Sequence, residues 1–204
     1  MSLESSQLGK SRGGRRTVLL VVLVFAAPVL AAWALYAMRG SWDLPTRNYG
    51  ELLDPVRPLG DYVLTSRDGA PLGTADLKGR WTLLYLNSGD CLQPCRDDLY
   101  KTRQVRWALN EDMQRVRRVF VMTSEPSDAA TLDALAAQHR DMQTVTAGEA
   151  TLRALGSDLE SGPGGPAVYL VDPLGNVVMR YPSGFEAEGL LSDLRRLLKV
   201  SKVG

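Results

Sequence analysis

Residues 81–95 read WTLLYLNSGDCLQPC, and they decide the fold. The first six residues form a continuous apolar run of strand length, which is typical of a central strand buried on both faces. Residues 87–90 break this run, and two cysteines follow at 91 and 95. A helix is then predicted, because residues recur at three- and four-residue steps from Cys95 through Leu99, Thr102, Val105, Leu109 and Met113 to Val116.

The rest of the chain alternates strands with helices in the same way. Further strands are predicted at 62–64, 119–122, 168–171 and 177–181, and further helices after Ser127 as N-cap and at 186–200. Residues 172–176 read DPLGN, which indicates a hairpin turn between the last two strands. The alternation predicts an α/β domain with a central sheet flanked by helices, in which the strands at 81–86 and 119–122 are parallel.

The composition fits one folded domain with an anchor and a tether. The chain has 204 residues, 45% of them hydrophobic and 23% charged. Its 24 basic and 23 acidic residues nearly balance, so nothing indicates a nucleic-acid-binding surface. The chain has only two cysteines and one histidine, which restricts the metal chemistry open to it.

Residues 17–38 contain no charge and are long enough to cross a hydrocarbon core of about 30 Å as one transmembrane helix. A cleaved signal peptide is the alternative, but its apolar region is usually only about 7–15 residues long. Basic residues are concentrated before this helix, at Arg12, Arg15 and Arg16. The positive-inside rule therefore predicts a single-pass protein of the inner membrane with a cytoplasmic N-terminus. The expected organisation is a cytoplasmic tail at 1–16, the membrane helix at 17–38, a proline-containing periplasmic tether at 39–60, and a periplasmic domain at 61–204.

Cys91 and Cys95 are the candidate functional site. At a helix N-terminus the free N–H groups and the dipole favour a thiolate; Arg96 acts in the same direction and Asp90 against it. The four-residue spacing lets the two sulfurs meet around one turn, so the pair can close a small disulfide or share Cu(I). Pro94 limits the conformations of the loop. A structural disulfide is the alternative, although so short a loop stabilises a fold only weakly.

Together these features resemble the Sco/SenC family of membrane-anchored, thioredoxin-like cytochrome c oxidase assembly proteins. The matching segments are the strand and turn at 62–69, the stretch 77–81, the two cysteines and the hairpin at 168–175. The resemblance implies that Pro166 faces the cysteine loop across a cis Gly165–Pro166 bond, so Pro166 and Pro94 are predicted to contact the partner.

The sequence departs from the family pattern in two ways. Leu92 and Arg96 follow the cysteines where the family has prolines, and Gly164 stands where the family has its copper-binding histidine. His139 is the only histidine, and we expect it at the end of a helix rather than at a metal. The chain therefore resembles a divergent member that lacks the copper-ligand histidine, which shifts the expectation from copper storage toward thiol–disulfide exchange.

The sequence thus predicts an assembly factor for a respiratory oxidase that acts as a thiol–disulfide oxidoreductase on an oxidase subunit or another periplasmic thiol protein. Cys91, near the exposed loop, is expected to attack and Cys95 to resolve. One alternative is a Cu(I) chaperone that uses the two thiolates as its metal ligands. The other is a non-catalytic interaction module with a structural disulfide.

Overall fold

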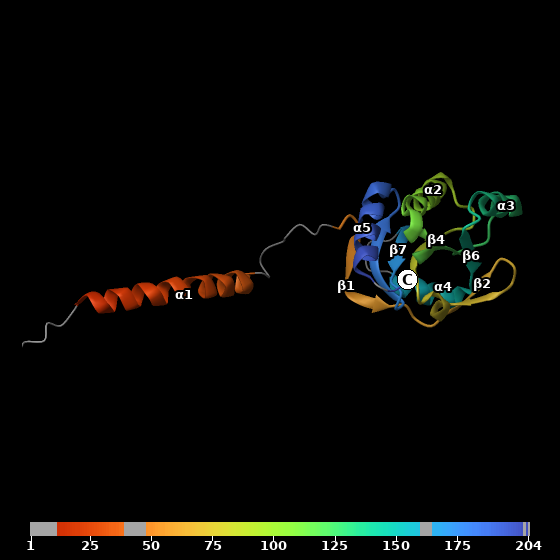
Figure 1. The fold of residues 1–204 in the computed structure, drawn as a ribbon. Helices are drawn as coiled ribbons and strands as arrows, with labels where there is room; N and C mark the ends of the chain where they lie inside the picture. Colours follow the sequence, from red (N-terminus) through yellow and green to blue (C-terminus); the bar gives the residue numbers. More distant parts are fainter. Residues whose placement is uncertain (1–11, 39–47, 160–164, 202, 204) are drawn as a thin grey trace, which may run out of the picture. The chain divides into compact units, whose positions relative to one another are not determined.

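The computed structural model describes residues 12–38, 48–159, 165–201 and 203, and the chain divides into two units between Thr46 and Arg47. The first unit contains helix α1 (Arg12–Met38), drawn in red in Figure 1. Its segment Arg16–Ala37 is long and apolar enough to cross a membrane, which makes it a candidate membrane span. The prediction of one N-terminal apolar helix is thereby confirmed.

The second unit is built on one eight-stranded mixed sheet. Across the sheet the strands run in the order β1-β8-β7-β4-β5-β6-β2-β3. Their bounds are β1 Glu51–Pro58, β2 Val63–Ser66, β3 Pro71–Gly73, β4 Trp81–Asn87, β5 Val116–Met122, β6 Met142–Thr146, β7 Ala167–Val171 and β8 Asn176–Pro182. Strand β4 pairs in parallel with β5, as predicted, and β5 pairs in parallel with β6. The β7–β8 hairpin is antiparallel and lies next to β4 on its other side.

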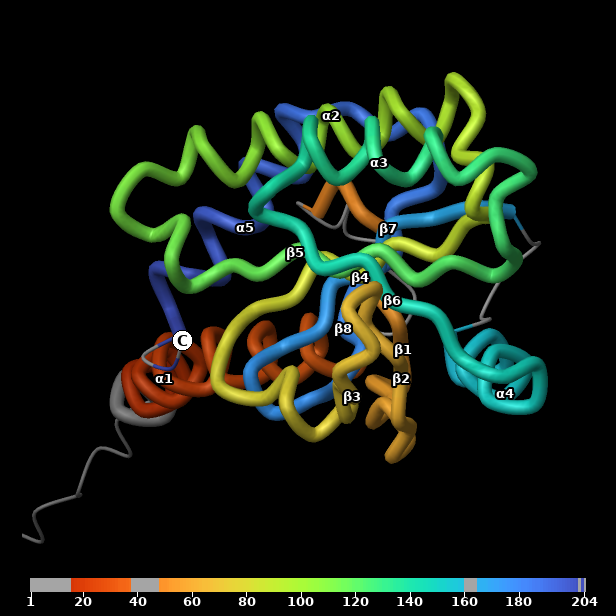
Figure 2. The backbone as a smooth tube through the Cα atoms, turned by 90° about the vertical axis from the view of Figure 1, so that its right-hand side faces the viewer, coloured from red at the N-terminus to blue at the C-terminus, as the bar shows by residue number. Residues whose placement is uncertain are grey.

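Helices cover both faces of this sheet. They are α2 Gln93–Ala108, α3 Ala129–Gln138, α4 Glu149–Leu159 and α5 Ala187–Val200, with short 3-10 turns at Thr74–Leu77 and Asn110–Arg115. Figure 2 shows α2, α3 and α5 on one face and α4 on the other. The predicted sheet flanked by helices is therefore confirmed.

Strand β4 joins the two apolar cores because successive side chains of a strand point to opposite faces. Leu83 and Tyr85 belong to the core beneath α2 and α5, whereas Leu84 belongs to the core on the α4 side. All three side chains are almost fully buried. This burial on both faces explains why the segment reads as a continuous apolar run. It also means that the cysteine loop follows a strand that is fixed in the core.

The structure corrects the predicted boundary between tether and domain. Residues 51–58 had been expected in the tether, but they form β1, an edge strand that pairs with β8. Pro55 and Pro58 concealed it, since prolines interrupt a strand pattern but are tolerated at a sheet edge. The sheet therefore begins before residue 61.

Two local predictions also differ from the structure, and some elements have no counterpart in the predictions. The helix after the cysteines ends at Ala108 and is followed by a 3-10 turn, so Val116 begins β5. Helix α3 is capped by Asp128, whose side chain accepts from the Ala130 N–H, and Ser127 is not its cap. Strand β6 and helix α4 were not predicted.

Candidate functional site

The two cysteines are joined in a disulfide at the point where β4 leads into α2. Their Cα atoms are 5.1 Å apart, within the normal range for a disulfide. Cys91 is 0% exposed and Cys95 is 2% exposed, so both sulfurs are covered in this form. Cys91 is predicted near the exposed loop, and Leu92, next to it, is 71% exposed, while the Cys91 side chain itself packs into the core beneath α2.

The N-terminus of α2 positions the disulfide. Leu92 is the N-cap residue without a side-chain hydrogen bond, and Pro94 lies exposed in the first turn, where a missing N–H costs nothing. Cys91 adopts a φ of +40°, which is uncommon for a residue other than glycine. The Arg96 Nε donates to the Cys91 carbonyl at 3.0 Å, which fixes this turn from the helix side.

The cysteine loop is also held from the β5–α3 connection. The Gly89 N–H donates to the Ser124 carbonyl at 3.0 Å. The Asp90 carboxylate accepts from the backbone N–H and the hydroxyl of Ser127, at 2.6 and 3.2 Å. The carboxylate that was expected to oppose a thiolate is thus engaged with Ser127.

A buried carboxylate lies one helical turn beyond Cys95. Asp98 is 0% exposed, and it accepts hydrogen bonds from the Tyr85 hydroxyl at 3.2 Å, from the Ser183 hydroxyl at 2.5 Å and from the Gly184 N–H at 3.0 Å. The Lys101 ammonium lies 3.8 Å away. Burial, together with the charge of Asp98, raises the pKa of Tyr85. Asp98 therefore ties the cysteine-bearing helix to β4 and to the turn after β8.

Pro166 belongs to the same region through Ser183. The Pro166 carbonyl accepts from the Ser183 N–H at 3.0 Å, while the Ser183 hydroxyl donates to Asp98. The expected cis Gly165–Pro166 bond is wrong, since the cis peptide bond within the described residues is Asp54–Pro55. Sequence reasoning missed Asp98 and Ser183, although Asp98 borders the apolar stripe that starts at Cys95.

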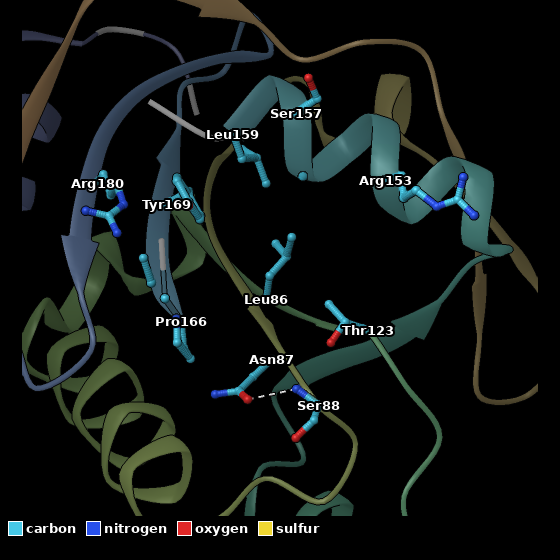
Figure 3. Close-up of a pocket in the computed structure, with 13 residues that line it drawn as sticks. Leu86, Asn87, Ser88, Thr123, Arg153, Ser157, Leu159, Pro166, Tyr169 and Arg180 are labelled. Carbon is cyan, nitrogen blue, oxygen red and sulfur yellow. Dashed lines mark hydrogen bonds between the residues drawn. The ribbon is translucent and has the colours of Figure 1, made fainter. Parts of the chain in front are cut away.

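A cavity of about 590 Å³ opens next to Pro166, at the ends of β4 and β5 and below α4. Figure 3 shows Asn87 and Ser88 on one side of it, and Leu159 and Arg153 of α4 on the other. Asn87 and Ser88 directly precede the cysteine loop. The cavity therefore adjoins the candidate site from the face of the sheet opposite to α2.

His139 lies away from the cysteines in a buried cluster of charges. Its Nδ1 is 3.4 Å from the Arg118 Nη2, and Arg118 also pairs with Asp141 at 3.0 Å. Burial, with Arg118 and Arg103 nearby, lowers the pKa of His139 to about 4. That His139 is not a metal ligand stays a prediction. Gly164, at the position of the family's histidine ligand, lies outside the described residues, so the loss of that ligand also stays a prediction.

Comparison with known proteins identifies the relatives of this site. Residues 81–201 match the family described as transmembrane-like, thioredoxin-like, C-terminal domain. The chain is 32% identical over 124 residues to the mitochondrial SCO2 homolog of Mus musculus, an alignment that covers 59% of this chain and 48% of the relative. The chain thus spans about half the length of the curated relatives it matches.

Solved structures share the fold. The copper-bound ScoI of Bradyrhizobium japonicum aligns with a TM-score of 0.54 at 21% identity, over 67% of this chain and 97% of that one. BsSco, described as a member of the Sco family of cytochrome c oxidase assembly proteins with a disulfide switch, aligns with a TM-score of 0.59 at 16% identity, over 74% and 99%. The predicted thioredoxin-like fold is thereby confirmed.

Proposed function

Because this chain belongs to the family of transmembrane-like, thioredoxin-like C-terminal domains, and its resemblance to the Sco/SenC family is confirmed, we propose that it assists the assembly of cytochrome c oxidase and its copper centre. It acts as a membrane-anchored periplasmic protein that exchanges thiols and disulfides through Cys91 and Cys95. The partner is an oxidase subunit or another periplasmic thiol protein.

The observation that carries this proposal is the Cys91–Cys95 disulfide at the start of α2. A helix N-terminus stabilises the thiolate that exchange requires. The disulfide closes only a short loop, so it adds little to the stability of the oxidised protein. The relative BsSco is described as having a disulfide switch, which supports a switching role for this pair as well.

The exchange follows ordinary thiol chemistry. In the reduced protein the Cys91 thiolate attacks one sulfur of a partner disulfide, and the electron pair of the broken bond leaves on the second partner sulfur. Cys95 then gives its proton to that thiolate and attacks the Cys91 sulfur, which releases the first partner sulfur as a thiolate. Two electrons pass from this protein to the partner, and the Cys91–Cys95 disulfide is formed. Pro166 and Pro94 flank the reacting pair and contact the partner.

Replacement of either cysteine in the full chain tests this proposal. In cells that lack the native copy, we expect Cys91→Ser and Cys95→Ser each to abolish oxidase activity at unchanged protein level. Gln93→Ala, in the same turn but without a sulfur, should retain it. Full oxidase assembly with Cys91→Ser would refute the exchange mechanism. Normal function of the double variant would favour the interaction module with a structural disulfide.

The periplasmic location has a separate test. Alkaline phosphatase folds into an active enzyme only in an oxidising compartment, since it needs disulfides. Fused after Gly204, it should be active, and fused within residues 1–16 in a chain shortened there, inactive. The reverse pattern would overturn the proposed orientation.

Copper transfer is the second candidate, because relatives with this fold are described with copper bound. Within the described residues no group of three or more His, Cys, Asp or Glu side chains could hold a metal ion. Two adjacent thiolates suit Cu(I), a soft ion, and Cys91 and Cys95 supply them after reduction. The reduced full chain should then bind nearly one Cu(I) per molecule, and the double cysteine variant none.

A further inference from the structure

The cavity beside Pro166 lies within reach of the disulfide. Ser88 forms part of its wall, and the Cys91 N–H donates to the Ser88 carbonyl at 3.2 Å. A hydrogen bond between residues i and i+3 marks a tight turn, which keeps the two Cα atoms within about 7 Å. An extended peptide advances about 3.3 Å per residue, so two or three residues span from Cys91 to the wall of the cavity at Ser88.

The charged residues in the described part of the cavity lining are basic. Among the described residues that line it, Arg153 and Arg180 are the charged ones, and none is acidic. Arg180 is only 6% exposed, binds Glu51 through Nη1 at 2.8 Å and also interacts with Tyr169, so it lies in the wall already paired within the protein. Arg153 stands at the rim, where its side chain is 72% exposed and pairs with Glu149. An exposed pair of this kind is weak, so a ligand can compete for the guanidinium.

The remaining lining suits a polypeptide. Ser88 and Thr123 supply hydroxyl groups that can bond a peptide backbone, and Leu86 and Leu159 supply apolar surface. The Asn87 amide accepts from the Ser88 N–H and donates to the Tyr85 hydroxyl. Figure 3 shows Leu86, Thr123 and Leu159 around the open space. Arginine is suited to a carboxylate because its planar fork forms paired hydrogen bonds with one.

We propose that this cavity binds an acidic, extended segment of the disulfide-exchange partner, with a carboxylate that reaches the rim across the cavity from Ser88. Arg153 binds the carboxylate at the rim, while Ser88 and Thr123 align the backbone toward Cys91. The inference rests on the proposed function, since the segment belongs to the exchange partner.

Direct binding tests the cavity without any exchange chemistry. The probe is a fluorescent ten-residue peptide in which serine replaces the cysteine and glutamate stands beyond the three residues that reach Ser88, titrated by anisotropy against the full chain in detergent. A matched peptide with glutamine in place of the glutamate should bind about tenfold more weakly, because a charge-assisted contact is lost. Equal binding of the two peptides would overturn the role of the carboxylate.

Gly156 allows the cavity to be filled without disturbing the fold. It lies in α4 and lines the cavity, and a Cβ added there meets no atom within 4 Å. Gly156→Phe should abolish peptide binding and leave the thermal unfolding temperature unchanged or raised, since glycine is a poor helix former. Gly148→Phe is the matched control: its Cβ also meets nothing within 4 Å, but the residue is not in the lining. Retained binding to Gly156→Phe would place the peptide elsewhere and refute the inference.

Charge removal at the rim gives a second variant. Arg153→Gln should weaken binding of the glutamate peptide about fivefold and leave the glutamine peptide unaffected. Arg67→Gln removes an exposed arginine that pairs with Asp133 away from the cavity, and it should change neither. A loss of binding that is the same for both peptides would contradict contact between Arg153 and the carboxylate.

The same peptides with a disulfide-bonded cysteine separate the two proposals. Binding of the glutamate peptide without exchange would leave the cavity assignment intact and refute the proposed function. Exchange at equal rates with glutamate and glutamine peptides would support the proposed function and refute this inference.

Discussion

Acid should destabilise the domain through His139. The side chain is 3% exposed, and burial, with the charges of Arg118 and Arg103, lowers its pKa from 6.5 to about 4. Below pH 6.5 the His139 ring is therefore protonated in the unfolded chain, whereas in the folded chain it stays neutral until the pH nears 4. Protons then favour the unfolded state, so the stabilisation is complete above pH 6.5 and is lost as the pH falls.

The size of the effect follows from the same pKa values. One pH unit of pKa displacement corresponds to about 1.4 kcal/mol, so a fall from 6.5 to about 4 limits the loss to about 3 kcal/mol, of which about 2.5 kcal/mol is expressed at pH 4.5. His139→Asn removes the titrating ring and keeps an oxygen that can accept from the Arg118 Nη2. The free energy of unfolding should then fall about 2.5 kcal/mol less between pH 7.5 and 4.5 than in the wild type.

Two measurements check this reasoning. Urea unfolding of the full chain in detergent, followed by tryptophan fluorescence, gives the free energy of unfolding at each pH. The chain has one histidine, so the ring proton signal in an NMR titration reports its pKa without assignment. Gln138→Asn, at the exposed neighbouring position, should keep the wild-type pH dependence. An unchanged pH dependence in His139→Asn, or a ring pKa near 6.5, would refute the argument.

Three further outcomes can be measured by unfolding or proteolysis. Asp98→Ala should cost about 3–5 kcal/mol, because the buried Tyr85 hydroxyl loses its acceptor. Asp98→Asn should recover more than half of that loss, since hydroxyls can reorient to accept; equal losses would contradict the hydrogen-bond account. Gly89→Ala should cost about 1–3 kcal/mol, because its Cβ would lie 2.6 Å from the Ser124 carbonyl oxygen. Asp193→Ala frees the Tyr49 N–H from α5 and should speed proteolytic cleavage near that residue, in a digest where wild type is cut slowly.

The sequence predicts those elements whose burial is visible in a single segment. Strand β4 is apolar over most of its length because both its faces are covered, and α5 shows a leucine stripe because one side packs on the sheet. Strand β6 has one fully buried residue in five, and α4 contains Gly156 and buries only Leu155 and Leu159. Their patterns are weak because neighbouring elements supply most of the contacts.

The candidate site divides in the same way. The cysteines can be recognised in the sequence by their chemistry and by their place between a predicted strand and a predicted helix. Asp98 resembles any charged residue of a surface helix, and its burial depends on Tyr85 and on Ser183, which lies 85 residues further along the chain. The cavity likewise combines the ends of β4 and β5 with α4, a helix that the sequence did not predict.

The burial of both sulfurs has a consequence for kinetics. A small reductant cannot collide with a disulfide whose cysteines are 0% and 2% exposed, so it must wait until the structure around the sulfurs opens. The rate of reduction should therefore rise with reductant concentration and then level off at the rate of that opening. A partner that opens the site as it binds is not limited by this rate. The buried disulfide is thus reduced faster by a protein that docks on this site than by small thiols in solution.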